Sequence, residues 1–364
     1  MSAIFERITI IGLGLIGSSI ARAAREYGLA NHITGYDKNL LATTYAKTHG
    51  FIDREENDAA SAVADNQLVI LATPPSALEN IAKAIAPALN SGAIVMDTAS
   101  VKRSAIQSIS AHLPAHVEYI PAHPIAGSEQ SGVQAGRADI FCKHYVIVTP
   151  DKAEISEALK QITRFWKATG AVIEAMPAPM HDMIYAYVSH LPHLLAYAAK
   201  QTIGDADDEK LRTFLRLSDS NIDLWSELFT LNQDNILAGL TRYMDATNHV
   251  MQELQQAPTD APVQHNDKAA ATVLFPRIAS SCLITTVMEA ERKAGVPFAR
   301  YAGQGFADFI SPTSTPPDAD IEHISGHYKQ VAGLIKEYNR RLSLVHDLLA
   351  RNQYKELSQV LSGE

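Results

Sequence analysis

Short runs of consecutive apolar residues alternate with helical patterns along the first half of the chain. The apolar runs cover residues 7–11, 33–36, 68–72, 93–96, 117–120 and 145–148. Runs of this length without polar alternation are typical of strands that are buried on both faces of a parallel sheet. Helical patterns cover residues 18–27, 77–88, 104–112 and 153–168, and a short strand is expected near residue 172. This alternation predicts a doubly wound, Rossmann-type α/β domain with a parallel sheet over residues 1–178.

The second half of the chain has a different pattern, in which the strand signals are absent. Long helices are predicted at residues 181–202, 221–256, 275–294 and 320–351, with polar, proline-rich loops at 257–267 and 311–318. We therefore expect an all-α helical domain over residues 179–364. A faint echo links LAGL at 237–240 with VAGL at 331–334. It is compatible with duplicated helical hairpins, although short apolar matches also arise by chance.

The composition fits a globular protein of two domains. The 364 residues include 46% hydrophobic and 20% charged residues, and the formal net charge is −9. No run of lysine or arginine stands out, which argues against nucleic acid or an acidic membrane surface as a partner. Residues 8–24 are apolar, but Glu6 stands beside Arg7 where a signal peptide has a cationic leader. No other stretch has the length and apolarity that are needed to cross a bilayer.

The chain has two cysteines, Cys142 and Cys282, which are far apart in the sequence. They form no CxxC motif and no cluster with histidine, so neither a disulfide framework nor a zinc site is expected. A reducing cytoplasm is the natural environment for such a chain, and no metal is predicted.

A glycine-rich turn follows the first predicted strand. Gly12, Gly14 and Gly17 have GxGxxG spacing and open a predicted helix. This pattern lets the backbone turn tightly, approach a pyrophosphate and pack the helix on the sheet, while the amides of Leu15 and Ile16 lie at the helix N-terminus, where phosphate binds. Asp37 ends the second strand, where a carboxylate accepts hydrogen bonds from ribose hydroxyls and repels a 2′-phosphate. The pattern predicts NAD binding, with NADP disfavoured although Lys38 follows Asp37.

The loop after the third apolar run also faces the expected ligand crevice. It reads Ala-Thr-Pro-Pro over residues 72–75. Because ligands bind beyond the carboxyl ends of the strands in such sheets, Thr73 and Pro74 are expected to border the cofactor. The alternative is that these residues only turn the chain.

Further polar motifs follow later strands. DTASVK places Ser100 after one strand, and HPIAGSE places His123 and Glu129 after the next. HD at 181–182 leads into SHLPH at 189–193 on the first long helix of the second domain. Ser100 could instead be a helix N-cap, and His190 and His193 could be core histidines. The convergence of Ser100 and His123 at one edge of a nucleotide-binding sheet favours a catalytic site.

In this order GLGLIG, ATPP, DTASVK, HPIAGSE, HD and SHLPH resemble the prephenate/arogenate (cyclohexadienyl) dehydrogenase family of tyrosine biosynthesis. The resemblance runs from about residue 7 to about residue 255, and HPIAGSE with SHLPH is its most specific part. Arg216, Trp225 and Asn235 are similar to an Arg…Trp…Asn segment of that family.

The resemblance implies NAD-dependent oxidative decarboxylation of prephenate, or of arogenate, to 4-hydroxyphenylpyruvate or tyrosine with release of CO₂. Such a reaction needs a base for the 4-hydroxyl group, a cation for a carboxylate and a nicotinamide against the ring. The family implies His123 as the hydrogen-bond acceptor or base, Ser100 as the residue that orients it, and Arg216 as the carboxylate clamp. The other implied substrate contacts are His193, Ser189 and Glu129.

The sequence departs from this family near Arg216. The family pattern, roughly GFxDxTR, has an acid just before the arginine, but residues 211–216 read LRTFLR, with Arg212 as a competing cation and no acid. A stretch near the C-terminus, GQGFADFI at 303–310, resembles the missing pattern without the arginine. The last hundred or so residues match no part of the family and lack the strand signals of an ACT domain.

Three alternatives remain open at the level of the sequence. The first is a strict arogenate dehydrogenase, whose pocket would hold an acid for the amino group. The second is a nicotinamide-binding redox regulator, which would need neither a base nor a clamp. The third is a dehydrogenase of 3-hydroxy acids or 6-phosphogluconate, which usually uses a lysine where this chain has histidines. By analogy the helical domain is expected to form a homodimer, and tyrosine feedback inhibition is left undecided.

Overall fold

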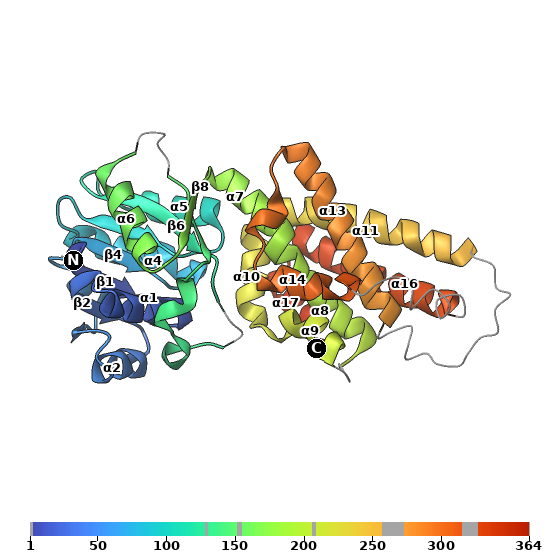
Figure 1. Ribbon diagram of the computed structural model, residues 1–364, viewed down its shortest axis with the longest axis horizontal. Helices are drawn as coiled ribbons and strands as arrows, with labels where there is room; N and C mark the ends of the chain where they lie inside the picture. Colours follow the sequence, from blue (N-terminus) through green and yellow to red (C-terminus); the bar gives the residue numbers. More distant parts are fainter. Residues whose placement is uncertain are drawn as a thin grey trace. The chain divides into compact units, whose positions relative to one another are not determined.

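A computed structural model describes residues 3–127, 130–150, 155–205, 209–256, 273–314 and 327–363. The chain divides into two compact units, residues 1–182 and 183–364 (Figure 1). The division lies inside helix α7 (Ala178–Tyr185), and the boundary expected from the sequence lies at the first residue of the same helix.

The first unit is built on an eight-stranded sheet with the order β3-β2-β1-β4-β5-β6-β7-β8. All strand pairs are parallel except β6 with β7, so the predicted doubly wound parallel sheet is confirmed, with one antiparallel pair that the sequence did not indicate. The strands are β1 (Phe5–Ile11), β2 (Ala30–Tyr36), β3 (Arg54–Glu55), β4 (Leu68–Leu71), β5 (Ile94–Asp97), β6 (Glu118–Pro124), β7 (Tyr145–Val148) and β8 (Val172–Ala175).

Both faces of this sheet are covered by helices, as the continuous apolar runs predict. On β4, Leu68 and Ile70 belong to one apolar core, and Val69 and Leu71 belong to the other. Because successive side chains on a strand point to opposite faces, this division places a core on each side of the sheet. Helices α1 (Leu15–Glu26), α2 (Leu40–Thr48) and α6 (Glu157–Ala168) contribute to the first core, and α3 (Ala59–Val63), α4 (Pro75–Ile85) and α5 (Lys102–Ser110) to the second.

The second unit is helical throughout its described residues, as predicted. Its elements are a π-helix η4 (Ala186–His190), α8 (Leu191–Ile203), α9 (Glu209–Leu215), η5 (Arg216–Asp219), α10 (Ile222–Leu231), α11 (Gln233–Gln256), α13 (Phe275–Ala294), η7 (Phe298–Tyr301), α14 (Gln304–Ile310), η8 (Ser311–Ser314), α16 (Tyr328–Ala350) and α17 (Tyr354–Ser362). The strands of the first unit and the helices of the second can be followed in Figure 1.

Two helices predicted as continuous are interrupted. The region 181–202 contains α7, the π-helix η4 and α8 in succession. Pro192 is the second residue of α8 and lacks the N–H that would continue the α-helical ladder, which explains why the turn before it is π-helical. The region 221–256 is divided between α10 and α11 at Asn232. The predicted loop at 257–267 lies outside the described residues, as does the start of the predicted helix at 320–351.

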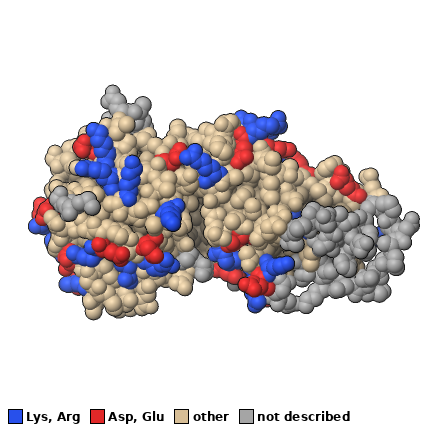
Figure 2. Space-filling view, viewed as in Figure 1, with Lys and Arg blue, Asp and Glu red and all other residues tan. Residues whose placement is uncertain are grey.

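The cysteines and the charged surface residues that the structure describes do not indicate a functional site. Both cysteines are free thiols, Cys142 exposed and Cys282 buried. Among the described helices, none combines the length and the apolarity that a membrane crossing requires. On the face shown in Figure 2, the basic and acidic side chains of the described residues are interspersed.

Candidate active site

The three glycines of the GxGxxG turn occupy three different environments. Gly12 has a φ of 91°, and a Cβ atom added there would lie 2.5 Å from the carbonyl oxygen of Ala72. A Cβ atom at Gly17 would lie 1.8 Å from the carbonyl oxygen of Gly12, so α1 can pack on the turn only without a side chain. At Gly14, the N-cap of α1, nothing lies within 4 Å of such an atom. The turn therefore leaves open space at the N-terminus of α1, which begins with Leu15 and Ile16 and suits a phosphate.

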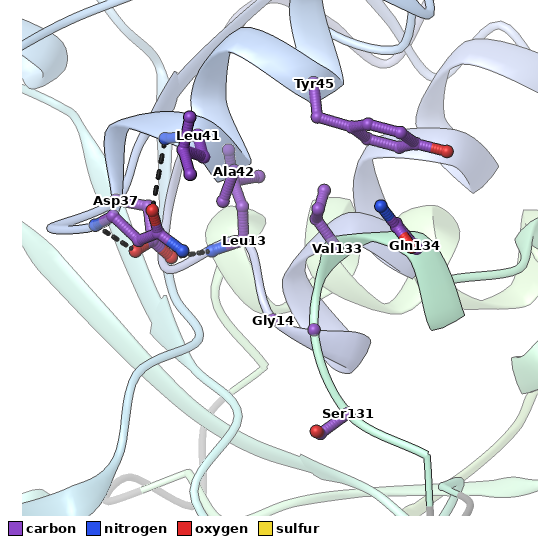
Figure 3. A pocket seen from close by; sticks show the side chains of 11 residues that line it. Leu13, Gly14, Asp37, Leu41, Ala42, Tyr45, Ser131, Val133 and Gln134 are labelled. Carbon is purple, nitrogen blue, oxygen red and sulfur yellow. Dashed lines mark hydrogen bonds between the residues drawn. The ribbon is translucent and has the colours of Figure 1, made fainter.

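Asp37 lies beside this turn and lines a cavity of about 580 Å³ (Figure 3). Its Oδ2 accepts a hydrogen bond from the N–H of Leu13 at 2.7 Å, and its Oδ1 accepts one from the N–H of Asn39 at 2.8 Å. These bonds hold the carboxylate at the cavity edge, and each oxygen has a further lone pair for a ligand hydroxyl. Lys38, which could favour NADP, is not among the residues that line the cavity.

The cavity also has walls that the sequence did not identify. Asn39, Leu41, Ala42 and Tyr45 line it from the start of α2, and residues 131–134 line it from a segment far along the chain. Figure 3 shows the ring of Tyr45 and the side chains of Val133 and Gln134 on this side. Tyr45 also stacks on His49, with ring centroids 3.9 Å apart. Nothing in the spacing of these residues links them to the glycine turn, which explains why sequence reasoning missed them.

Thr73 and Pro74 lie at the carboxyl end of β4, next to the glycine turn. The Cγ2 atom of Thr73 would be 2.8 Å from a Cβ atom at Gly12. The Oγ1 atom of Thr73 is buried and has no hydrogen-bond partner among the described residues. Pro74 is the N-cap of α4 and provides no side-chain cap. An unpartnered buried hydroxyl beside the turn supports a ligand contact at Thr73 better than a purely structural turn.

Ser100 does not cap α5, which rules out the alternative role that the sequence suggested. The N-cap of α5 is Val101, and its side chain makes no capping bond. The cap is supplied by Asp182, 80 positions downstream. Its Oδ1 accepts the N–H of Lys102 at 2.7 Å, and its Oδ2 accepts the N–H of Arg103 at 2.9 Å. The hydroxyl of half-buried Ser100 is therefore not used to start the helix.

A chain of hydrogen bonds runs from Asp182 through His181 to His123. His123 lies within β6, which extends further than the predicted strand at 117–120. Its Nδ1 is 2.8 Å from Nε2 of His181, whose Nδ1 is 2.8 Å from Oδ1 of Asp182. His181 and Asp182 are fully buried.

The positions of the ring protons on His181 and His123 follow from the protonation state of Asp182. Burial by itself raises the pKa of Asp182, but the hydrogen bond from His181 and the two backbone N–H groups lower it on balance, so it is a carboxylate. Burial lowers the pKa of His181, which is therefore neutral. Its Nδ1 faces the carboxylate and carries the proton, so its Nε2 accepts. Consequently His123 donates from Nδ1 to His181, and Nε2 is the ring nitrogen through which His123 would act as a base.

A buried lysine anchors the strand that carries His123. Lys102 is fully buried, contacts Oδ2 of Asp97 and donates to the carbonyl of Ala122 at 2.5 Å. Oδ1 of Asp97 accepts from the hydroxyl of Tyr119 at 2.8 Å and from the N–H of Ala122 at 3.3 Å. The pair thus holds the residue directly before His123. Sequence reasoning singled out only Ser100 in DTASVK and did not predict this role for Lys102.

In the second unit, His193 stacks on Trp225 with ring centroids 3.4 Å apart and an angle of 19°. Its Nδ1 lies 2.8 Å from the carbonyl oxygen of Ser189, within the π-helix. The pKa of His193 is lowered to about 3, chiefly by burial and also by the charges of His190 and Arg216, although the hydrogen bond to the Ser189 carbonyl raises it. His193 is therefore neutral, with its proton on Nδ1 and an acceptor at Nε2. It can accept a hydrogen bond from a substrate, but it cannot supply positive charge.

Arg216 has the acidic partner that its own segment lacks. Its Nε is 2.6 Å and its Nη2 is 2.5 Å from Oδ2 of Asp308, while Oδ1 of Asp308 accepts from Gln304 at 2.7 Å. Asp308 belongs to the stretch at 303–310 that resembles the missing family pattern. The side chain of Arg216 is about one third exposed, at 35%. Since a guanidinium has five N–H donors, the ion pair orients Arg216 without using all of them.

Two further residues are explained differently. His190 is buried, and its Nδ1 accepts from the amide of Asn232, which in turn accepts from Asn235 at 2.8 Å. His190 and Asn235 therefore belong to a core network, as the core interpretation of His190 proposed. Glu129 lies outside the described residues.

Comparison with known proteins decides the family. Residues 20–175 match the family model described as the nucleotide-binding domain of prephenate dehydrogenase, and residues 177–262 match the model of its dimerization domain. The chain is 36% identical over 255 residues to the cyclohexadienyl dehydrogenase of Zymomonas mobilis, which covers 66% of this chain and 86% of the relative. The chain belongs to the prephenate dehydrogenase family.

Two other relatives agree with this assignment. The prephenate dehydrogenase of Bacillus subtilis is 27% identical over 251 residues, covering 65% of this chain and 67% of the relative. A crystal structure of prephenate dehydrogenase from A. aeolicus in complex with hydroxyphenyl propionate and NAD⁺ has a TM-score of 0.62 and 27% identity, and covers 80% of this chain and 97% of that one.

Membership in the prephenate dehydrogenase family confirms the predicted family, the dinucleotide-binding first domain and the helical second domain. It makes the chain a dehydrogenase, so the regulator without catalysis is set aside. The match to the dimerization model supports the predicted homodimer through the helical domain. The roles of the individual site residues stay predictions.

Proposed function

We propose that this chain catalyses the NAD-dependent oxidative decarboxylation of prephenate in tyrosine biosynthesis, with arogenate as a second substrate. The relatives named prephenate and cyclohexadienyl dehydrogenase support this proposal. The observation that carries it is the hydrogen-bonded chain from Asp182 through His181 to His123, because it fixes the Nδ1 proton of His123 and links this ring to a buried carboxylate. A histidine oriented in this way is a suitable base for removal of a hydroxyl proton.

The cofactor half of the proposal is supported by the fit of the first unit to a dinucleotide. The space above Gly14 and the N-terminus of α1 suit the pyrophosphate, and Asp37 suits the ribose hydroxyls. The cavity bordered by Asp37 and Tyr45 is large enough for a nucleoside. The structure of the A. aeolicus relative in complex with NAD⁺ supports NAD as the cofactor. When bound, NAD accepts the hydride from the ring carbon that bears the 4-hydroxyl group.

The chain's own residues then have separate tasks. His123 takes the proton of the 4-hydroxyl group as the carbonyl forms, and Ser100 orients the hydroxyl. The positive charge that develops on His123 is stabilised through His181 by the buried carboxylate of Asp182. Loss of the ring carboxylate as CO₂ makes the ring aromatic and draws the reaction forward.

Binding of the substrate is assigned to the second unit. Arg216, held by Asp308, binds a substrate carboxylate, because its guanidinium is always charged and is oriented in advance. His193 is neutral, so it accepts a hydrogen bond from the substrate through Nε2 and does not compete for the carboxylate. Ser189 supports this task, since its carbonyl fixes the tautomer of His193.

The test is NADH formation by the purified protein with prephenate and with arogenate, each supplied with NAD and with NADP. We expect turnover of prephenate with NAD. His123→Asn should lower kcat by about 100-fold or more without changing NAD affinity. If only arogenate reacts, the strict arogenate dehydrogenase is correct; if neither reacts while NAD binds, the proposal fails.

Arg216 has a natural control in Arg212, which is four positions away and exposed. Arg216→Ala should raise the KM for the carboxylate substrate by about tenfold to 100-fold, as expected for loss of a charged hydrogen bond. Arg212→Ala should leave the KM unchanged. Equal effects of the two substitutions would mean that general positive charge, and not a clamp at Arg216, attracts the substrate.

A further inference from the structure

The helices of the second unit occur as two similar series along the chain. The first series is α8, α9, η5 and α11, and the second is α13, α14, η8 and α16; α10 is inserted before α11 in the first series, and η7 before α14 in the second. α9 and α14 have seven residues each, and each is followed directly by a 3-10 helix of four residues. α11 has 24 residues and α16 has 23. The dimerization model matches only as far as residue 262, so it covers the first series alone.

Both series begin with the same local irregularity. α8 follows the π-helix η4 and has Pro192 as its second residue. α13 follows π-helical backbone at residues 273–274 and has Pro276 as its second residue. A π-helical turn before a proline is rare enough that its recurrence, together with the order of the elements, indicates one repeated motif.

Equivalent residues of the two series meet each other. Tyr243 in α11 and Tyr338 in α16 are 95 positions apart, and their hydroxyls are 3.4 Å apart. Phe214 in α9 and Phe309 in α14 have the same separation in sequence, and their ring centroids are 4.7 Å apart. Residues that touch their own equivalents lie on a two-fold axis. The axis therefore passes between α11 and α16 and between α9 and α14.

The contacts away from this axis are reciprocal. The hydroxyl of Tyr243 donates to the carbonyl of Ala279, the fifth residue of α13, at 3.2 Å. The hydroxyl of Tyr338 donates to the carbonyl of Leu195, the fifth residue of α8, at 3.1 Å. At the level of helices, α8 packs on α16 and α13 packs on α11. Contacts in which i meets j and j meets i are the signature of an interface between two identical copies.

We propose that residues 273–350 are a second, diverged copy of the helical motif at 183–256, and that the chain forms within itself the pair that a dimerization domain otherwise forms between two chains. The echo between LAGL and VAGL lies in the correct two helices, although its spacing of 94 is one residue short of the structural register. The surface on which a partner would pack is occupied by the chain's own second copy. The chain is therefore expected to be a monomer in solution, in contrast to the homodimer that the sequence and the match to the dimerization model support.

The two copies have diverged at one ion pair. In the register of 95, Asp308 is equivalent to Thr213, and Ser311 is equivalent to Arg216. The first copy has kept the arginine and the second has kept the acid, so one Arg216–Asp308 pair remains and its symmetric counterpart, Thr213 with Ser311, is neutral. This explains the missing acid before Arg216: Asp308 is the positioning residue for the clamp, and it comes from the second copy.

The first test is the mass of the protein in solution, measured by light scattering at the concentrations used for catalysis. This inference does not rest on the proposed function, because the measurement needs no substrate. We expect the mass of one chain at every concentration measured. The mass of two chains, or a mass that rises towards that of two chains as the concentration increases, would overturn the proposal.

The second test rebuilds the lost ion pair. Thr213→Asp alone should lower the urea midpoint of unfolding, and Thr213→Asp with Ser311→Arg should restore it to the wild-type midpoint or above, because the two new charges meet across the axis. The control, Thr213→Asp with Ser314→Arg, has the same charges three positions out of register and should show no recovery. Additive effects of the 213 and 311 substitutions, or equal recovery in the control, would refute the symmetric register.

Discussion

Replacing Asp182 by asparagine should remove the base function of His123 without touching the substrate. The N–H donors to the carboxylate of Asp182 include His181 Nδ1, Lys102 N, Arg103 N and Arg103 Nε, at 2.7 to 3.1 Å. An asparagine keeps only one acceptor oxygen, so its NH₂ group must replace one of the two carboxylate oxygens and face the N–H donors that this oxygen accepted. If the NH₂ group faces His181, Nδ1 of His181 becomes an acceptor, its proton moves to Nε2, and His123 must then hold its own proton on Nε2. The base atom is blocked.

The magnitude follows from these contacts. Loss of general-base catalysis costs about 100-fold to 10⁴-fold in kcat. At least one buried N–H loses its acceptor, which lowers the free energy of unfolding by about 1–3 kcal/mol. The assay combines kcat from NADH formation, NAD affinity, and side-chain ¹H–¹⁵N spectra of labelled histidines, which report which ring nitrogen is protonated.

The control is Tyr119→Phe, which removes a 2.8 Å hydrogen bond from Asp97 in the same buried layer but leaves the histidine chain intact. It should lower stability to a similar extent and leave the tautomer of His123 unchanged. If Asp182→Asn keeps kcat within about threefold of wild type while folded, or if its spectra show the wild-type tautomers, the assignment of the base is refuted.

Further predictions concern the cofactor site and the pH dependence of stability. Gly14→Ala should fold normally and weaken NAD binding by about tenfold or more. Gly17→Ala should prevent stable folding, because its Cβ meets a backbone oxygen. Thermal melting and NAD titration distinguish the two variants, and equal melting temperatures would contradict the turn geometry. Asp37→Ser should reduce the preference for NAD over NADP in kcat/KM by about tenfold, and an unchanged ratio would show that Asp37 does not face the ribose. The pKa of His193 is about 3 in the folded protein and 6.5 in the unfolded chain. Between these two pH values the unfolded chain binds more protons than the folded protein, so the free energy of unfolding decreases as the pH falls from 6.5 towards 3. His193→Gln should flatten the dependence of unfolding free energy on pH by up to about 1.4 kcal/mol per pH unit, and urea titrations showing an unchanged slope would mean that His193 is protonated in the folded protein.

The features that sequence reasoning recovered are those encoded by local patterns. The glycine turn, Asp37 and the buried strands each depend on residues close together in the chain, and the structure places them as expected apart from the antiparallel β6–β7 pair. That pair was missed because a strand buried inside the sheet has the same apolar run whichever direction it runs.

The features that it missed depend on contacts between distant segments. Asp182 caps a helix 80 positions upstream, and Asp308 pairs with an arginine 92 positions before it. No sequence pattern around Asp182 or Asp308 indicates which distant residue each of them contacts. The HD dipeptide and the GFADF stretch were both noticed as resemblances, but only the folded chain shows what each of them contacts.

The capping of α5 by Asp182 affects how the first unit can be made. A ribosome releases the chain from the N-terminus, so α5 emerges long before the residue that satisfies its first two amides. Until residue 182 has emerged, the N–H groups of Lys102 and Arg103 lack their acceptor, and His123 lacks the partner that fixes its proton. Nascent chains ending before the HD dipeptide therefore hold an incomplete nucleotide-binding unit, and the last residues of that unit to leave the ribosome are the ones that set its chemistry.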